Sequence, residues 1–134
     1  MTDVDLKGKR PISPHVQHGA YKLTLSMVTS ISHRMSGVAL YVGLFFLAYW
    51  LIALAIGPEA FETAQTLWGS ILGRLVLFVF TWALMHHMIG GIRHFIWDIP
   101  AMMEKPQIEF LYRATLIGGF VSTLIIWVIG YAVM

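Results

Sequence analysis

The chain has 134 residues, of which 57% are hydrophobic and only 12% are charged, and its formal net charge is +2. Charged residues make up about 25% of an average soluble domain, so this composition excludes an ordinary soluble fold and indicates an integral membrane protein. The small net charge argues against nucleic-acid binding. The lack of cysteine excludes disulfides and cysteine-ligated iron–sulfur clusters on this chain.

The chain begins with a polar segment, residues 1–30, which contains Pro11 and Pro14. This segment does not resemble a cleavable signal peptide, because the apolar run that follows it is too long for the apolar core of such a signal. We expect residues 1–30 to lie outside the membrane and the first transmembrane helix to begin near Ile31.

Three apolar segments follow, and each is long enough to cross about 30 Å of hydrocarbon as a helix. They predict transmembrane helices over residues 31–56, 68–97 and 114–133, joined by loops over residues 57–67 and 98–113. The dipeptide Gly57-Pro58 is typical of the end of a helix. The predicted fold class is therefore all-α, an integral membrane protein with three transmembrane helices.

The distribution of lysine and arginine predicts the orientation of these helices. Five lie toward the N-terminus and three in or beside the second loop: Lys7, Lys9, Arg10, Lys22 and Arg34, then Arg93, Lys105 and Arg113. The first loop and the C-terminal end have none. By the positive-inside rule, the N-terminal segment and the loop 98–113 are cytoplasmic, whereas the loop 57–67 and the C-terminus are external. The polar ends of the first two helices then meet near the cytoplasmic face.

Three histidines lie near the end of the second predicted helix, in "HHMIGGIRHFIWD" (86–98). At 100° per residue, one stripe holds His87, Gly91, His94 and Asp98, and the neighbouring stripe holds His86, Gly90 and Arg93. His87 lies about ten residues from the cytoplasmic boundary, roughly 15 Å deep, where a histidine usually has a partner. Two interpretations follow: a hydrogen bond to a neighbouring helix, or a metal ligand.

The metal-ligand hypothesis draws support from Gly91, one turn beyond His87, because a missing side chain there leaves room for a flat macrocycle such as haem. Glycine also serves plain helix packing, so both interpretations stay open. Four side chains near the membrane surface are candidates to contact the haem propionates: Arg34, Arg93, His33 and His94. His33 lies too shallow to reach the iron opposite His87, so a second axial ligand is expected from another chain.

A second polar cluster, "SMVTSISHRMSG" (26–37), opens the first predicted helix. Helical periodicity places Ser26, Ser30, His33, Arg34 and Gly37 on one face, whereas Ser32 points away from Arg34. Ser30 and Arg34 are one turn apart, and a hydroxyl with a guanidinium suits a quinone head group, whose oxygens become anionic on reduction. The alternative is a helix start with a serine cap and an anchoring arginine.

Both clusters resemble the cytochrome b membrane-anchor subunit of succinate dehydrogenase. The matching stretches are "RPISPH" (10–15), "SISHRMSG" (30–37) and "HMIGGIRHFIWD" (87–98), which follow the family patterns RP-x-SPH, S-x-x-HR-x-SG and H-x3-G-x-RH-x3-D. Their order and the three-helix layout match as well, so the resemblance covers nearly the whole chain.

The resemblance implies a role for each candidate residue. His87 corresponds to the axial ligand of haem b, with Gly91 and Asp98 as structural neighbours of the haem. Ser30 and Arg34 correspond to ubiquinone-pocket residues. The positions of His33, Arg34 and His94, together with Arg93 beside them, correspond to the haem propionates or the pocket.

The resemblance also implies partners and a location. A second membrane-anchor subunit would complete the helix bundle and supply the other axial histidine. An iron–sulfur subunit and a flavoprotein subunit would dock on the cytoplasmic side and deliver electrons for ubiquinone reduction, so this chain is no enzyme by itself. We expect the bacterial inner membrane rather than the mitochondrial one.

Three rival functions remain open at this stage. The chain could anchor a fumarate reductase that uses menaquinone, or serve as a structural anchor without haem. It could also carry protons or ions along its His/Arg/Asp stripe, although no deep carboxylate supports that function. His86 beside His87 leaves the choice of ligand open as well.

Overall fold

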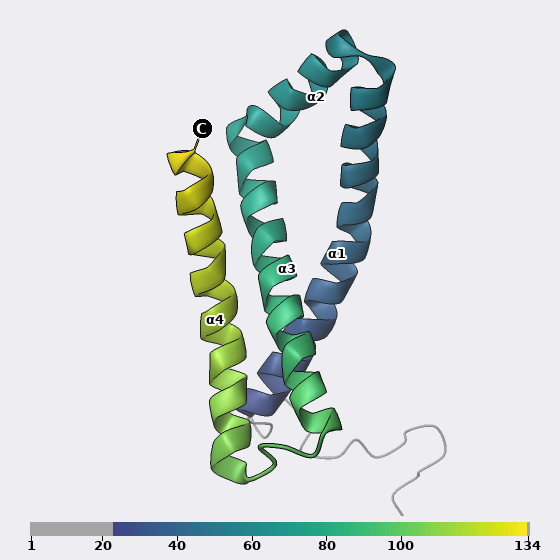
Figure 1. The fold of residues 1–134 in the computed structure, drawn as a ribbon. Helices are drawn as coiled ribbons and strands as arrows, with labels where there is room; N and C mark the ends of the chain where they lie inside the picture. The colour runs from purple at the N-terminus through teal and green to yellow at the C-terminus, as the bar shows by residue number, and fades with distance from the viewer. Residues whose placement is uncertain (1–22, 134) are drawn as a thin grey trace, which may run out of the picture.

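A computed structural model describes residues 23–133, and this part of the chain consists of four helices without strands. The helices are α1 (Leu25–Ile56), α2 (Pro58–Gly69), α3 (Ile71–Asp98) and α4 (Lys105–Ala132) (Figure 1). Of these, α1, α3 and α4 are long and apolar enough to cross a membrane. The predicted all-α class with three transmembrane helices is confirmed.

Two of the three long helices, α1 and α4, begin earlier than their apolar cores, whereas α3 begins at Ile71, three residues later than predicted. α1 begins at Leu25 rather than near residue 31, and α4 begins at Lys105 rather than near residue 114. At 1.5 Å per residue, helices of 32 and 28 residues measure roughly 48 and 42 Å, well beyond a hydrocarbon core of about 30 Å. The start of α4 is set by local chemistry, because Glu104 and Gln107 form a capping box around it.

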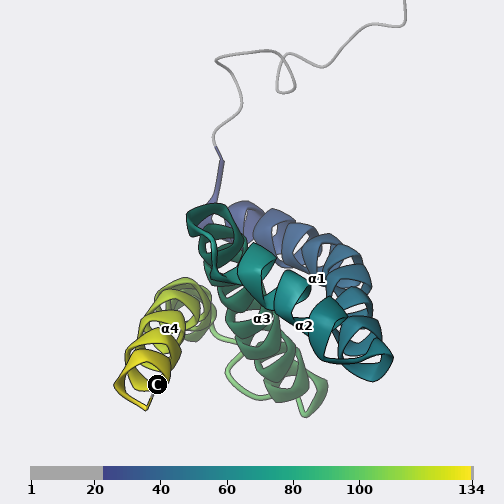
Figure 2. The same cartoon turned by 90° about the horizontal axis from the view of Figure 1, so that it is seen from above.

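The segment 57–67, expected to be a loop, instead forms most of helix α2, which is preceded by Gly57 and also takes Trp68 and Gly69 from the predicted second span. Gly57 makes the turn out of α1 with φ +139°, a conformation that favours glycine. Pro58 then occupies the first turn, where its missing N–H costs nothing, and Glu59 complements the helix dipole. α2 lies across the end of the bundle between α1 and α3 (Figure 2).

The long helices approach one another closely at glycines. A Cβ on Gly119 of α4 would lie 3.0 Å from Cα of His86 on α3. A Cβ on Gly90 of α3 would run into the His33 ring of α1. Close backbone approach through small residues is the usual way in which membrane helices associate. α1 therefore crosses α3 near His33 and diverges from it toward α2, while α4 follows α3 (Figures 1 and 2).

The described part of the chain, residues 23–133, buries few large apolar side chains. The buried hydrophobic residues among those described are three alanines and one leucine: Ala53, Ala64, Ala83 and Leu111. Large residues such as Phe45, Ile117 and Val128 are about two-thirds exposed, at 66%, 63% and 69%. Surfaces this apolar suit lipid or other membrane helices.

We predict that Gly119→Ala destabilises the protein by about 1–3 kcal/mol, because the added methyl group meets the α3 backbone, which cannot move aside. Thermal unfolding in detergent measures the effect. Gly130→Ala on the same helix is the matched control, since a Cβ there meets nothing within 4 Å. The control should be neutral or stabilising by up to about 1 kcal/mol through helix propensity. Equal destabilisation by both variants would contradict the α3–α4 packing.

Candidate functional site

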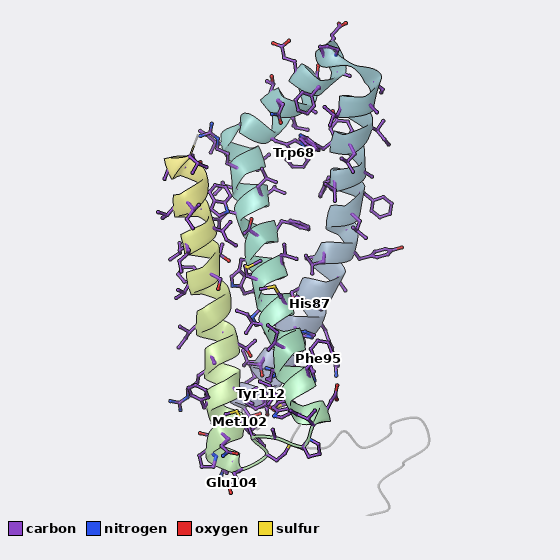
Figure 3. The ribbon with its side chains drawn as sticks, viewed as in Figure 1. Trp68, His87, Phe95, Met102, Glu104 and Tyr112 are labelled. Atoms are coloured by element: carbon purple, nitrogen blue, oxygen red, sulfur yellow. The ribbon has the colours of Figure 1, made fainter. Side chains whose placement is uncertain are left out.

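His33 and His87 exchange hydrogen bonds where α1 crosses α3. Nε2 of His33 lies 3.3 Å from the carbonyl oxygen of His87, and Nδ1 of His87 lies 3.1 Å from the carbonyl oxygen of His33. The two rings stack with centroids 4.1 Å apart and planes 11° apart. Figure 3 labels His87 at this crossing. Each pair of atoms therefore links α1 to α3 and also holds one histidine ring in a fixed orientation.

The exchange assigns the protons of both rings. A carbonyl oxygen only accepts hydrogen bonds, so Nε2 of His33 and Nδ1 of His87 must both carry hydrogen. In a neutral His87, Nε2 then keeps its lone pair, and no hydrogen bond within residues 23–133 occupies it. His87 offers one ring nitrogen that is ready to accept a metal.

The space beside His87 is open on the stripe predicted from periodicity. A Cβ on Gly91 would meet nothing within 4 Å, whereas one on Gly37 of α1 would lie 3.1 Å from Cε1 of His87. His94 and Asp98, further along the stripe, are exposed. The His94 ring also meets His33 edge-on, with centroids 5.5 Å apart. The stripe is thus a surface along α3 that begins at His87 and ends at Asp98.

His86 points in a different direction and is fully buried, with 0% of its surface exposed. Its Nε2 lies 3.0 Å from Oγ of Ser32 on α1. Its ring stacks on Trp82 at a centroid distance of 5.3 Å, and Gly119 of α4 covers its backbone. A group outside the bundle has no access to His86, so the geometry favours His87 as a ligand.

Ser30 and Arg34 lie at the edge of α1, beside the His33–His87 contact. Ser30 is half-buried, Arg34 is exposed, and neither makes a hydrogen bond with another side chain in the described part of the protein. Their hydroxyl and guanidinium groups remain available to a ligand. One helix edge cannot enclose a head group, so a pocket there needs walls from outside the described residues.

Arg93 differs from the other predicted propionate contacts because its side chain is buried against α4. It is 4% exposed, and its guanidinium carbon lies 5.1 Å from the ring centre of Trp97 and 5.0 Å from that of Tyr112. Its Nη1 lies 3.4 Å from Oγ1 of Thr115 on α4. These cation–π contacts stabilise a guanidinium that has no carboxylate partner among the described residues. Arg93 therefore contacts α4, while His87 faces the open stripe.

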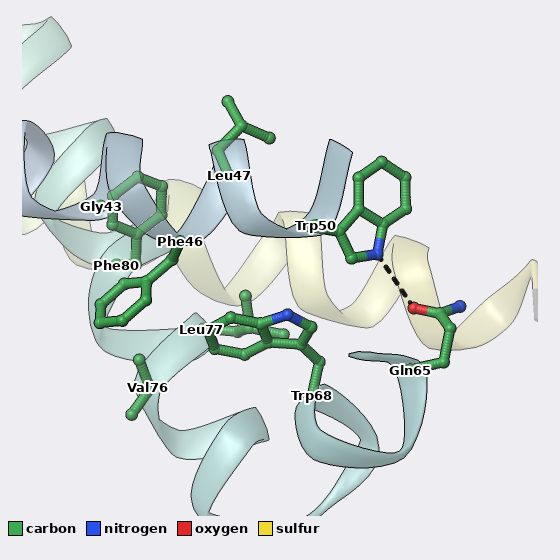
Figure 4. A pocket seen from close by; sticks show the side chains of 9 residues that line it. All are labelled: Gly43, Phe46, Leu47, Trp50, Gln65, Trp68, Val76, Leu77 and Phe80. Atoms are coloured by element: carbon green, nitrogen blue, oxygen red, sulfur yellow. Dashed lines mark hydrogen bonds between the residues drawn. The ribbon is translucent and has the colours of Figure 1, made fainter. Parts of the chain in front are cut away.

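An apolar pocket lies at the opposite end of the bundle, beneath α2. It measures about 300 Å³ and lies between α1 and α3. Phe46 and Trp68 line it, and Nε1 of Trp50 donates to Oε1 of Gln65 at its rim over 3.1 Å (Figure 4). None of the predicted site residues contributes to this pocket.

The few candidate metal ligands in the described residues suit a metal that is already bound within a cofactor. Within residues 23–133, no group of three or more His, Asp or Glu side chains could hold a metal ion. A single histidine nitrogen beside open space is instead the arrangement that an iron in a macrocycle requires, because the macrocycle supplies four ligands.

Comparison with known proteins shows the family of the chain. Residues 7–126 match the family model described as the succinate dehydrogenase/fumarate reductase transmembrane subunit. The chain belongs to this family. It is 36% identical to the succinate dehydrogenase cytochrome b556 subunit of Paracoccus denitrificans, over 93% of this chain and 94% of that one. It is 32% identical to the Rickettsia prowazekii subunit of the same name, over 92% and 95%.

A mitochondrial protein is similar as well. The mouse succinate dehydrogenase cytochrome b560 subunit is 38% identical over 74% of this chain and 59% of its own length. The family consists of membrane subunits of an oxidoreductase complex, which agrees with the three membrane-spanning helices. The chain is therefore a membrane subunit of such a complex.

Sequence reasoning missed the contacts of two serines in this transmembrane subunit. Ser32 was expected to point away from Arg34, and it does, but it contacts His86 instead of lipid. Ser36 is buried and lies 3.2 Å from Nδ1 of His87. The sequence does indicate a shared environment for the two serines, because Ser36 falls one helical turn after Ser32 and on the same side of the helix.

We predict that Ser32→Ala destabilises the subunit by about 1–3 kcal/mol, because the buried Nε2 of His86 loses its hydrogen-bond partner. Ser30→Ala is the matched control: it makes the same chemical change half a turn earlier, where the hydroxyl makes no hydrogen bond within the described chain. Thermal unfolding should separate the two variants. Equal midpoints would mean that the Ser32–His86 contact contributes nothing to stability.

Proposed function

We propose that the chain is the haem b-binding membrane anchor of a succinate dehydrogenase, which passes electrons from an iron–sulfur subunit to ubiquinone. The observation that carries this proposal is His87, whose Nδ1 is held by the carbonyl of His33 while Nε2 stays free beside the open face at Gly91. The relatives named cytochrome b556 subunits support it.

The residues present fit a haem. His87 would supply one axial nitrogen, and the open face at Gly91 would take the edge of the macrocycle. His94 and Arg34 are exposed near the membrane surface, where propionates would lie, and His33 links them to His87. Bound haem supplies a one-electron redox centre. The second axial ligand would come from a second anchor subunit.

Arg93 is a weaker candidate for the propionates, because its guanidinium is buried against α4. Asp98 would act at the rim, since it ends α3 and is exposed there. Gly91 and Asp98 thus bracket the proposed haem face along α3, while Arg93 supports the bundle behind it.

For the quinone, Ser30 and Arg34 would form this chain's part of the pocket. The Ser30 hydroxyl would donate a hydrogen bond to a quinone oxygen, and the Arg34 guanidinium would stabilise the negative charge that develops there on reduction. Because both groups lie on an exposed helix edge, the iron–sulfur subunit and the second anchor would close the pocket around the ring.

The proposed orientation places the histidine end of the bundle, formed by the start of α1, the end of α3 and the start of α4, at the cytoplasmic side of a bacterial inner membrane. The flavoprotein and iron–sulfur subunits would dock there. We predict that a reporter active only outside the cytoplasm is active when fused after Met134 and inactive when inserted at residues 101–106, between α3 and α4. The reverse pattern would contradict the orientation.

We predict that His87→Ala abolishes or strongly alters the b-type haem spectrum of the purified complex, because it removes the ring nitrogen that the carbonyl of His33 holds ready to bind. His86→Ala should keep the spectrum, since that ring is enclosed by Ser32, Trp82 and α4. An optical difference spectrum measures both.

Three outcomes would contradict this assignment. Loss of haem in His86→Ala but not in His87→Ala would reverse the choice of ligand. Loss of haem in Arg93→Met with intact assembly would show that Arg93 reaches the propionates. A wild-type complex without haem would favour a haem-free anchor.

We predict that Ser30→Ala and Arg34→Leu each slow quinone reduction about ten- to hundredfold. Losing a hydrogen bond to a charged group costs about 1.5–3 kcal/mol, and 1.36 kcal/mol is about tenfold. Succinate oxidation with a soluble dye that takes electrons upstream should barely change. Ser122→Ala on α4 is the matched control. A similar loss in Ser122→Ala, or an equal loss with the dye, would contradict the assignment of the pocket.

A further inference from the structure

Two adjacent histidines on α3 face two serines that are one turn apart on α1. Ser32 contacts His86 and Ser36 contacts His87. Both serines donate to a carbonyl three residues earlier on their own helix: Ser32 to Thr29 over 3.1 Å, and Ser36 to His33 over 2.7 Å. A serine has one hydroxyl proton, so each Oγ is left to accept a hydrogen bond from its histidine.

At His86 this arrangement occupies Nε2, the ring nitrogen farther from the backbone, with a hydrogen bond. Nε2 donates to Oγ of Ser32 over 3.0 Å, and the remaining nitrogen, Nδ1, is buried without a partner among the described residues. Both nitrogens of this ring therefore lie inside the bundle. The Ser32 hydroxyl stabilises His86 as a structural side chain.

At His87 the arrangement has the opposite effect. The proton on Nδ1 is shared between the carbonyl oxygen of His33 at 3.1 Å and Oγ of Ser36 at 3.2 Å. Ser36 is 2% exposed, so water does not compete for this proton. The ring is held from behind by two acceptors, and Nε2 is the nitrogen that remains outside.

We propose that Ser36 is a positioning residue that holds the His87 ring and sets its strength as an iron ligand. This inference rests on the proposed haem-binding function. A hydrogen bond from the second ring nitrogen fixes the tautomer of a metal-bound histidine and raises its basicity. A more basic ligand stabilises the oxidised iron relative to the reduced iron, so the Ser36 hydroxyl lowers the reduction potential of the haem.

The experiment is a potentiometric titration of the haem in the whole purified complex, with haem content and low-spin electron paramagnetic resonance as further readouts. Ser36→Ala removes one of the two acceptors. The preference of the site for oxidised over reduced iron should fall by up to about tenfold, a rise in potential of about 59 mV for one electron. Ser36→Thr, which keeps a hydroxyl, should restore the wild-type potential.

Ser32→Ala is the matched control, because the same change one turn earlier affects only His86. It should leave the potential unchanged. If Ser36→Ala does not assemble, Ser36→Cys provides a near-isosteric test, since its thiol is a weak acceptor and should shift the potential in the same direction.

The results separate this inference from the function on which it rests. An unchanged potential in Ser36→Ala or Ser36→Cys, with full haem content, would overturn the positioning role and leave haem binding intact. An equal shift in Ser32→Ala would overturn it as well. A complex without haem, or one that keeps its haem spectrum in His87→Ala, would overturn the proposed function and this inference together.

Discussion

The pair of hydrogen bonds between His33 and His87 is the interaction on which the arrangement of the site depends. In hydrocarbon an unpaired polar group is costly, and here each ring satisfies a nitrogen by donating to the backbone of the other helix. The contact needs Gly90, because a side chain there would displace the His33 ring, and Gly37 lets the His87 ring lie close against α1. The same contact that joins α1 to α3 leaves Nε2 of His87 without a hydrogen bond in the described residues. The packing of the two helices and the geometry of the proposed ligand therefore depend on the same interaction.

The polar residues of α3 divide between two environments. His86 and Arg93 face α1 and α4, which supply a serine, a tyrosine ring and a threonine. The stripe from His87 through Gly91 to His94 touches α1 at its two histidines and is open at Gly91. Few large apolar side chains of the four helices are buried, so lipid or other subunits must cover most of the apolar surface of these helices. An open stripe on such a surface is where a partner subunit would complete a shared site.

Much of this could be predicted from the sequence, because hydropathy and helical periodicity are strong signals in a membrane protein. Three apolar runs predicted the three long helices, and a 100° rotation per residue separated the His86 stripe from the His87 stripe, as the structure shows. Helix α2 was missed because a short amphipathic segment carries no hydropathy signal. The direction of Arg93 was not predictable, because periodicity does not say which stripe α4 covers. The serine contacts depend on the angle at which α1 crosses α3, which a sequence pattern does not contain.

The most direct test of the account is a high-resolution structure of the whole complex with its haem bound. The account predicts that Nε2 of His87 coordinates the iron at about 2.0 Å, a usual metal–imidazole distance. It also predicts that Nδ1 of His87 still donates to the carbonyl of His33 and that His86 remains on Ser32. Coordination by His86, or by Nδ1 of His87, would contradict it, because either would require breaking the contact between α1 and α3.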